Sequence, residues 1–150
     1  MKIAMLAWGS LIWEPHTLQT ASCFVPFGPI LPVEFSRMSG AVGKPKRLTL
    51  VMDEANGSSC HTYTAKSELL DLDKALLNLW VREGSDAEKL PTCIRESGRV
   101  GFVDLTSGTS NAKALKQHPG ATETIRSWAT ATGHDAVIWT ALGSNFHEDE

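Results

Sequence analysis

The chain has 150 residues, of which 42% are hydrophobic and 21% are charged, and its formal net charge is −3. This composition is typical of a folded domain rather than a disordered chain, and we predict a single domain over residues 1–150. Basic residues are scattered and no apolar run reaches about 18 residues, so we expect no nucleic-acid partner and no membrane span.

The cysteines and histidines do not form the spacings that metal sites or disulfide frameworks need. Cys23, Cys60 and Cys93 are far apart and odd in number, and none belongs to a CxxC pair. The five histidines show neither HxxxH nor HExxH spacing. We therefore expect no metal. Free thiols suit a reducing compartment, so we also expect a cytoplasmic location.

The first apolar run, "MLAWGSLIWEP" over residues 5–15, admits two ordinary interpretations. It could be the core of a signal peptide, but Gly9 and Ser10 interrupt it and a Glu-Pro pair follows at once. A strand over residues 2–8, buried on both faces and ending in a turn at Gly9-Ser10, agrees better with the pattern.

Further strands follow from alternating or continuous apolar residues, and we predict them over 33–38, 47–53, 60–65, 99–105 and 135–142. The prolines of residues 26–32 favour a loop or an edge segment, because proline cannot donate to a strand ladder. Asn56-Gly57 predicts a hairpin that pairs the strands on either side of it.

Helical periodicity predicts two main helices. One covers residues 68–83, with Ser67 as N-cap and Gly84 as the stop, and the other covers 121–132. A less regular helical segment is expected over 85–97, broken by Pro91, and a polar loop over 106–120. Strands interspersed with two clear helices predict a mixed α+β fold.

Glu83 is the most informative residue of the first helix. Leu69, Leu72, Leu76, Leu79 and Glu83 are spaced 3, 4, 3 and 4 positions apart, which places the carboxylate on the apolar stripe. Burying an ionised carboxylate is costly unless it is paired or hydrogen-bonded. Glu83 could therefore reach water at a frayed helix end, pair with Arg47 or Arg99, or line a cleft and transfer protons in catalysis.

Three segments in order resemble the γ-glutamylcyclotransferase-like superfamily, and its ChaC-like branch in particular. They are "WGSLIW" at 8–13, "RLTLVMDEANGSSCHTYTA" at 47–65 and "LLNLWVREG" at 76–84. The separation of 73 positions between Ser10 and Glu83 (83 − 10) agrees with that branch. The similarity covers about the first 85 residues and fades beyond them.

The resemblance implies a compact mixed β-barrel flanked by helices, and an enzyme that uses no cofactor. Its reaction converts a γ-glutamyl amine, amino acid or peptide to 5-oxoproline and a free amine. By position, Trp8, Gly9, Ser10 and Leu11 would hold the substrate and Glu83 would be the general acid/base. Gly9 would permit backbone geometry closed to other residues and a close approach of the ligand.

Departures from the family pattern bear on the substrate. Trp8 stands where the family usually has tyrosine, and the strand containing His61 to Tyr63 lacks a glycine often found there. Gly143-Ser144-Asn145 repeats the chemistry of the first loop, either as ordinary loop composition or as part of the cleft wall.

The sequence is also compatible with other functions. The fold could bind a small molecule without turnover, and a homodimer is compatible with the sequence. A cysteine enzyme using Cys60 and His61 is disfavoured, because successive strand residues point to opposite faces. Ser10 as a hydrolase nucleophile is also disfavoured, because "WGSLI" does not match GxSxG.

Overall fold

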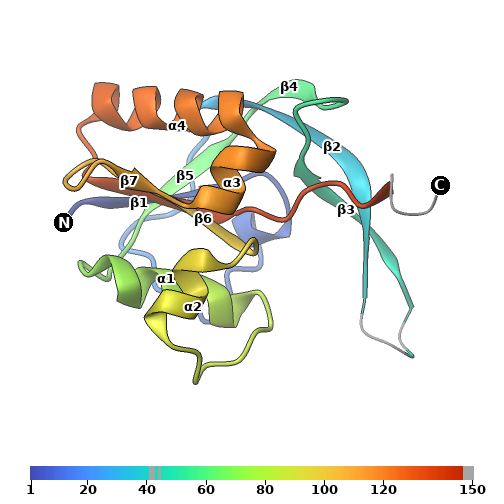
Figure 1. Cartoon of the computed structure of the whole chain (residues 1–150), viewed down its shortest axis with the longest axis horizontal. Coiled ribbons are helices and arrows are strands. Elements are labelled where there is room, and N and C mark those ends of the chain that lie inside the picture. The colour runs from blue at the N-terminus through green and yellow to red at the C-terminus, as the bar shows by residue number, and fades with distance from the viewer. Residues whose placement is uncertain (41–42, 44, 147–150) are drawn as a thin grey trace.

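The computed structural model describes residues 1–40, 43 and 45–146, and these form a mixed α+β fold (Figure 1). Eight strands lie in two sheets, with the orders β5-β1-β8-β6-β7 and β3-β2-β4. The mixed fold class is confirmed. No closed barrel is found among the described strands, so the barrel that the family resemblance implies is not confirmed.

The elements follow the predicted order, but the single strand predicted over 60–65 is divided at Thr62 between the two sheets, and Pro91 begins the short helix of the 85–97 segment instead of breaking it. The strands are β1 Ile3–Ala7, β2 Ile30–Ser39, β3 Arg47–Met52, β4 Ser58–His61, β5 Tyr63–Lys66, β6 Val100–Asp104, β7 Thr109–Ser110 and β8 Ala136–Thr140. The helices are α1 Leu72–Arg82, α2 Pro91–Glu96, α3 Ala112–Gln117 and α4 Pro119–Thr132, and a 3-10 turn, η1, covers Ser10–Ile12.

Strand β1 lies inside the larger sheet, and all five of its residues are buried. Ile3 and Met5 belong to the core that includes α1, whereas Ala4 and Leu6 belong to the core that includes α4. Figure 1 shows these helices on opposite faces of the sheet. Burial on both faces explains why the first strand has no polar alternation.

The parallel pairing of β1 with β8 brings two distant segments together. Met5 is opposite Ile138 and the two strands run in the same direction, so their carboxyl ends lie on the same side of the sheet. The turn after β1 and the chain after Thr140 therefore emerge side by side. Continuing that register places Thr140 beside Ala7, close to the Gly9 turn.

The predicted hairpin at Asn56-Gly57 is wrong. Strands β3 and β4 do not pair with each other; both run antiparallel to β2, on its two opposite edges. The chain passes from one edge of β2 to the other at Gly57, where a β-carbon would lie 2.7 Å from the Val33 nitrogen. Glycine is needed here for close backbone approach, which a turn signal in the sequence cannot distinguish from a hairpin.

The loop-or-edge prediction for residues 26–32 fails at its end, because Pro32 lies inside the central strand β2. At that position β2 pairs with β4, where Pro32 is opposite Ser59. On its other side the ladder with β3 begins only at Val33, and the Pro32 carbonyl accepts a hydrogen bond from the Asp53 N–H. A missing donor is tolerated at the point where one partner strand ends.

The start of the first predicted helix and the polar loop predicted over 106–120 need correction. Helix α1 starts at Leu72 and its N-cap is Asp71, whose carboxylate accepts from the Lys74 N–H at 3.1 Å. Ser67 instead forms an isolated β-bridge with Thr20. Residues 68–71, between Ser67 and the start of α1, are not helical. The polar loop predicted over 106–120 contains β7 and the short helix α3.

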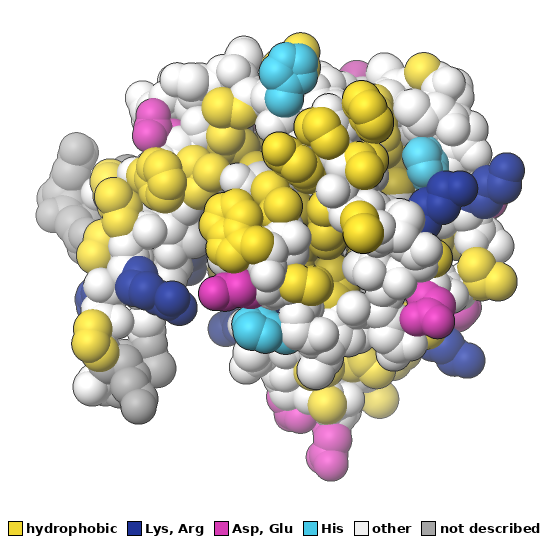
Figure 2. All heavy atoms as spheres, turned by 180° about the vertical axis from the view of Figure 1, so that it is seen from behind, with side chains coloured by type: hydrophobic (Ala, Val, Ile, Leu, Met, Phe, Trp, Pro, Cys, Tyr) yellow, Lys and Arg dark blue, Asp and Glu magenta, His cyan; other side chains and the backbone are white. Residues whose placement is uncertain are grey.

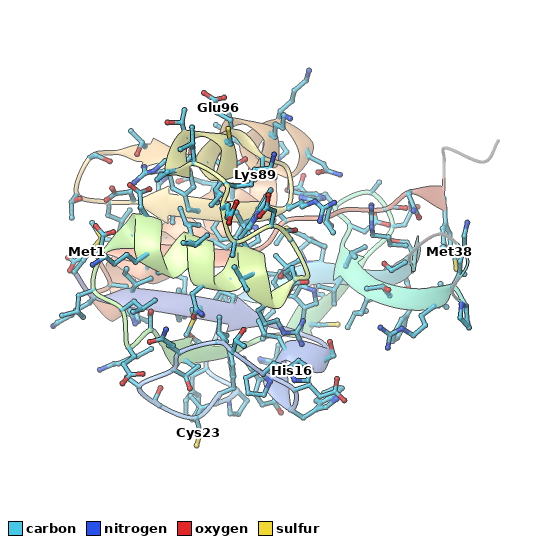
Figure 3. All side chains as sticks on the ribbon, turned by 90° about the horizontal axis from the view of Figure 1, so that it is seen from below. Met1, His16, Cys23, Met38, Lys89 and Glu96 are labelled. Carbon is cyan, nitrogen blue, oxygen red and sulfur yellow. The ribbon has the colours of Figure 1, made fainter. Side chains whose placement is uncertain are left out.

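The smaller sheet projects from the rest of the molecule. Figure 3 shows Met38 at the far end of β2, well away from the labelled His16 and Cys23. Figure 2 shows apolar side chains gathered over the face opposite to that of Figure 1. Exposed apolar residues include Trp13, Phe27 and Ile30. The homodimer compatible with the sequence stays a prediction.

Within the described residues, no helix is long and apolar enough to cross a membrane.

Candidate functional site

The loop after β1 forms the tight turn η1, with Gly9 as its N-cap. Gly9 has φ −142° and ψ −139°, so its φ is not in the left-handed region. A β-carbon on Gly9 would meet nothing within 4 Å. A left-handed conformation is therefore not what calls for glycine at this position, while the open space beside Gly9 leaves room for a ligand.

The start of η1 offers backbone donors. Gly9 has no side chain that could cap the turn, and the N–H groups of Ser10 and Leu11 have no hydrogen-bond partner among the described residues. The first amides of a helical turn lack intrahelical acceptors and bind acceptors from outside. Ser10 is exposed, whereas Leu11 is buried in the core with α1, so Leu11 contributes its backbone only.

Glu83 caps the carboxyl end of α1, and its side chain is 19% exposed. Its Oε1 accepts a hydrogen bond from Thr140 Oγ1 at 3.2 Å and forms an ion pair with Arg82 Nη1, also at 3.2 Å. Both contacts use the same oxygen, which leaves Oε2 as the atom available to a substrate. The Glu83 carboxylate therefore lies at the carboxyl end of β8.

Arg82 connects Glu83 to the loop after β1. Its Nη2 donates to the Glu14 carbonyl at 2.7 Å and to Ser10 Oγ at 3.4 Å, while Nη1 contacts Glu83. The Arg82 side chain is only 10% exposed, and its Nε is buried without a partner. One guanidinium thus spans the two segments that the family resemblance pairs, and Ser10 and Glu83 lie on either side of it.

Glu83 pairs with Arg82, and not with Arg47 or Arg99 as predicted. Arg99 donates to Ser85 Oγ at 2.7 Å and lies over the Trp80 ring, and Arg47 lies opposite Ser39 in the smaller sheet. Helical periodicity places Arg82 on the polar side of α1, away from the stripe that carries Glu83. The helix ends at Arg82, so the two adjacent side chains can converge.

Among the described residues, the other candidates, Trp8, Cys60 and His61, form no hydrogen bond with Glu83 or Arg82. Trp8 is half-buried against the core formed with α4. Cys60 and His61 are consecutive in β4, and Cys23, Cys60 and Cys93 are all free thiols. Thr140, which contacts Glu83, carries no motif that marks it in the sequence, whereas Arg82 lies inside the segment at 76–84, where helical periodicity places it on the polar side of its helix.

A shallow cavity of about 420 Å³, largely open to solvent, lies near the ends of β1 and β8, but Glu83 and the Gly9 turn are not among its lining residues. Its wall includes Gly143 and Ser144, from the segment that repeats the chemistry of the first loop. Arg37 Nη1 donates to the Gly143 carbonyl at 3.1 Å, and Ser144 Oγ donates to the Ser36 carbonyl at 2.8 Å. In Figure 1 this segment runs from β8 towards the smaller sheet.

Because His118, next to this wall, is buried, we expect the free energy of unfolding to depend on pH. Its side chain is 3% exposed, and burial lowers the pKa of the imidazole against the opposing effect of the carboxylates of Glu54 and Asp53. The unfolded chain therefore takes up a proton near pH 6.5 before the folded one does. Stability is full above that pH and is lost as the pH falls towards the folded pKa, by at most about 1.4 kcal/mol per pH unit for this group.

Urea unfolding at pH 7.5 and 5.5 measures this dependence. His118→Gln should reduce the loss of unfolding free energy between the two pH values, whereas the exposed control His61→Gln should keep the wild-type loss. Burial also lowers the pKa of His134, so a residual dependence is expected in both variants. An unchanged loss in His118→Gln contradicts the prediction.

Comparison with known proteins returns no match to any family model, curated protein or solved structure. The case for a function therefore rests on the residues themselves, on their geometry and on the resemblance of the three sequence segments.

Proposed function

We propose that the protein is a γ-glutamylcyclotransferase-like enzyme that releases 5-oxoproline from a γ-glutamyl amine, amino acid or peptide. Glu83 acts as general acid/base, and the turn of Gly9, Ser10 and Leu11 holds the glutamyl group. One observation carries the proposal: Arg82 contacts both Glu83 and Ser10, which are 73 positions apart in the chain.

The chemistry is an intramolecular acyl transfer. The α-amine nitrogen of the glutamyl group attacks its own γ-carbonyl carbon, and the bond from that carbon to the leaving nitrogen breaks. Glu83 takes a proton from the attacking nitrogen and returns it to the leaving one, so the step needs no oxidant or reductant. Amides at the start of η1 would stabilise the developing oxyanion or bind the substrate carboxylate, about 3 kcal/mol for each well-placed donor.

The fold, location and substrate class that the resemblance implies belong to the same proposal. We propose that the two sheets correspond to the barrel of that superfamily, because β4 continues into β5 of the other sheet through the single residue Thr62. A cytoplasmic site of action, a small-molecule γ-glutamyl substrate and independence from cofactors are part of this proposal.

A panel of γ-glutamyl compounds tests the activity directly. The full chain is incubated with γ-glutamyl amines, amino acids and peptides, and 5-oxoproline is quantified by mass spectrometry. Release from at least one compound, proportional to protein concentration, supports the proposal. No release from any member of the panel contradicts it.

Substitution at Gly9 separates ligand contact from folding. A β-carbon there meets nothing within 4 Å, so Gly9→Ala should remain folded, with a change in unfolding free energy no larger than the roughly 0.5–3 kcal/mol typical of a single substitution. The methyl group would occupy the space beside the backbone amides, and kcat/KM should fall by roughly tenfold or more. Full activity in Gly9→Ala would exclude close substrate approach at this residue.

A second candidate, binding without turnover, is favoured by the ion pair between Arg82 and Glu83. A carboxylate that is already paired with an arginine is consistent with a structural or ligand-binding role for Glu83. This candidate predicts thermal stabilisation by a γ-glutamyl compound with no 5-oxoproline formed, which the same panel measures.

A further inference from the structure

We propose that the cavity of about 420 Å³ near the end of β8 binds a compact small molecule that carries at least two phosphate or carboxylate groups. The cavity lies between β2, the chain entering β6, helix α3 and the segment after β8. This second site is independent of the cyclotransferase proposal, since it rests on the cavity walls and not on Glu83.

The walls carry a concentrated positive charge. Arg37, Arg99 and Lys113 line the cavity, and none of the described residues that line it carries a carboxylate. None of these three cations forms an ion pair with another described residue. Like charges around one cavity repel one another, so an anion bound between them would relieve an unfavourable arrangement.

Neutral contacts hold two of the cations in place. Arg37 donates to the Gly143 carbonyl at 3.1 Å, and Arg99 donates to Ser85 Oγ at 2.7 Å and lies 5.8 Å from the centre of the Trp80 ring. A guanidinium has five N–H donors in a planar fork that matches phosphate and carboxylate groups. Each contact leaves donors on the same guanidinium for an anion, and less side-chain entropy is lost on binding.

The rest of the lining argues for a compact and polar ligand. Ser97, Gln117 and Ser144 add neutral polar groups, and Leu142 is the only large apolar side chain of the wall. Among the described residues no aromatic side chain lines the cavity, so they offer a nucleobase no stacking surface. A polyphosphate or polycarboxylate without a large apolar part has the chemistry that this wall complements.

Isothermal titration calorimetry with pyrophosphate and with citrate tests the site on the full chain. We expect binding of at least one of them, with affinity falling as salt rises from about 0.1 M to 1 M, because the Debye length shrinks from about 10 to 3 Å. Arg99→Gln and Lys113→Gln should each weaken binding by about tenfold or more. Tighter binding of pyrophosphate assigns phosphate chemistry, and tighter binding of citrate assigns carboxylate chemistry.

Lys116→Gln is the matched control, since Lys116 lies on α3 with Lys113 and loses the same charge but does not line the cavity. Thermal unfolding of each variant establishes that it is folded. Wild-type affinity in Lys116→Gln, together with weakened binding in the two cavity variants, supports the site. Absence of binding by both probes overturns it, as does equal weakening in all three variants, which would indicate unspecific surface charge.

Discussion

Glu83→Gln is expected to lower the rate of 5-oxoproline release by roughly 10²- to 10⁴-fold, the usual contribution of a general acid/base. The amide is nearly isosteric with the carboxylate, and its oxygen can still accept from Thr140 Oγ1, which contacts Glu83 at 3.2 Å. The variant loses the proton acceptor and the charge that faces Arg82. The rate is measured on the best substrate of the panel, and the fold by thermal unfolding.

Glu14→Gln is the matched control for Glu83→Gln. Glu14 lies shortly after the Gly9 turn, and its substitution makes the same chemical change as Glu83→Gln. Arg82 contacts the backbone carbonyl of Glu14 and not its carboxylate. Activity close to wild type is expected there. If Glu83→Gln retains full activity in a folded protein, Glu83 is not the catalytic base and the cyclotransferase assignment fails in this form.

Arg82→Gln should destabilise the fold and disturb the site together. The guanidinium joins Glu83 to the loop of Ser10 and Glu14, and hydrogen bonds to charged groups contribute about 1.5–3 kcal/mol each. Removing it also leaves a half-buried carboxylate with Thr140 as its remaining partner. We expect a loss of at least about 1.5 kcal/mol in unfolding free energy, measured by urea denaturation.

Arg82→Lys distinguishes charge from geometry at this position. A lysine keeps the positive charge but lacks the fork that reaches two partners at once, so it should restore little of the lost stability or turnover. Arg126→Gln is the control, because Arg126 pairs with the exposed Glu123 at 3.5 Å and such surface pairs contribute about 1 kcal/mol or less. Wild-type stability in Arg82→Gln would show that the connection between the two segments is not structural.

Turnover by the Arg82 variants also separates the two candidate functions. In a cyclotransferase, loosening the Gly9 turn misplaces the glutamyl group, and kcat/KM should fall even with Glu83 present. In a binding protein without turnover, wild type and variants alike form no 5-oxoproline, and only ligand-induced stabilisation changes.

Local patterns in the sequence determined the parts of this protein that depend on near neighbours along the chain. Buried strands β1, β6 and β8 follow from apolar runs, and α4 follows from helical periodicity ended by Gly133. The apolar stripe of the α1 helix also identified Glu83 as a carboxylate at an unusual position, because helical spacing alone fixes which residues share a face.

Only the tertiary structure decided the contacts between distant segments. The turn at Gly57 joins opposite edges of β2 instead of closing a hairpin, since strand pairing depends on partners far away in sequence. The parallel pairing of β1 with β8 brings Thr140 towards the Gly9 turn, and the end of α1 lets Arg82 reach Ser10 and contact Glu83. Periodicity describes one element at a time, whereas a site at the edge of a sheet depends on how several elements end together.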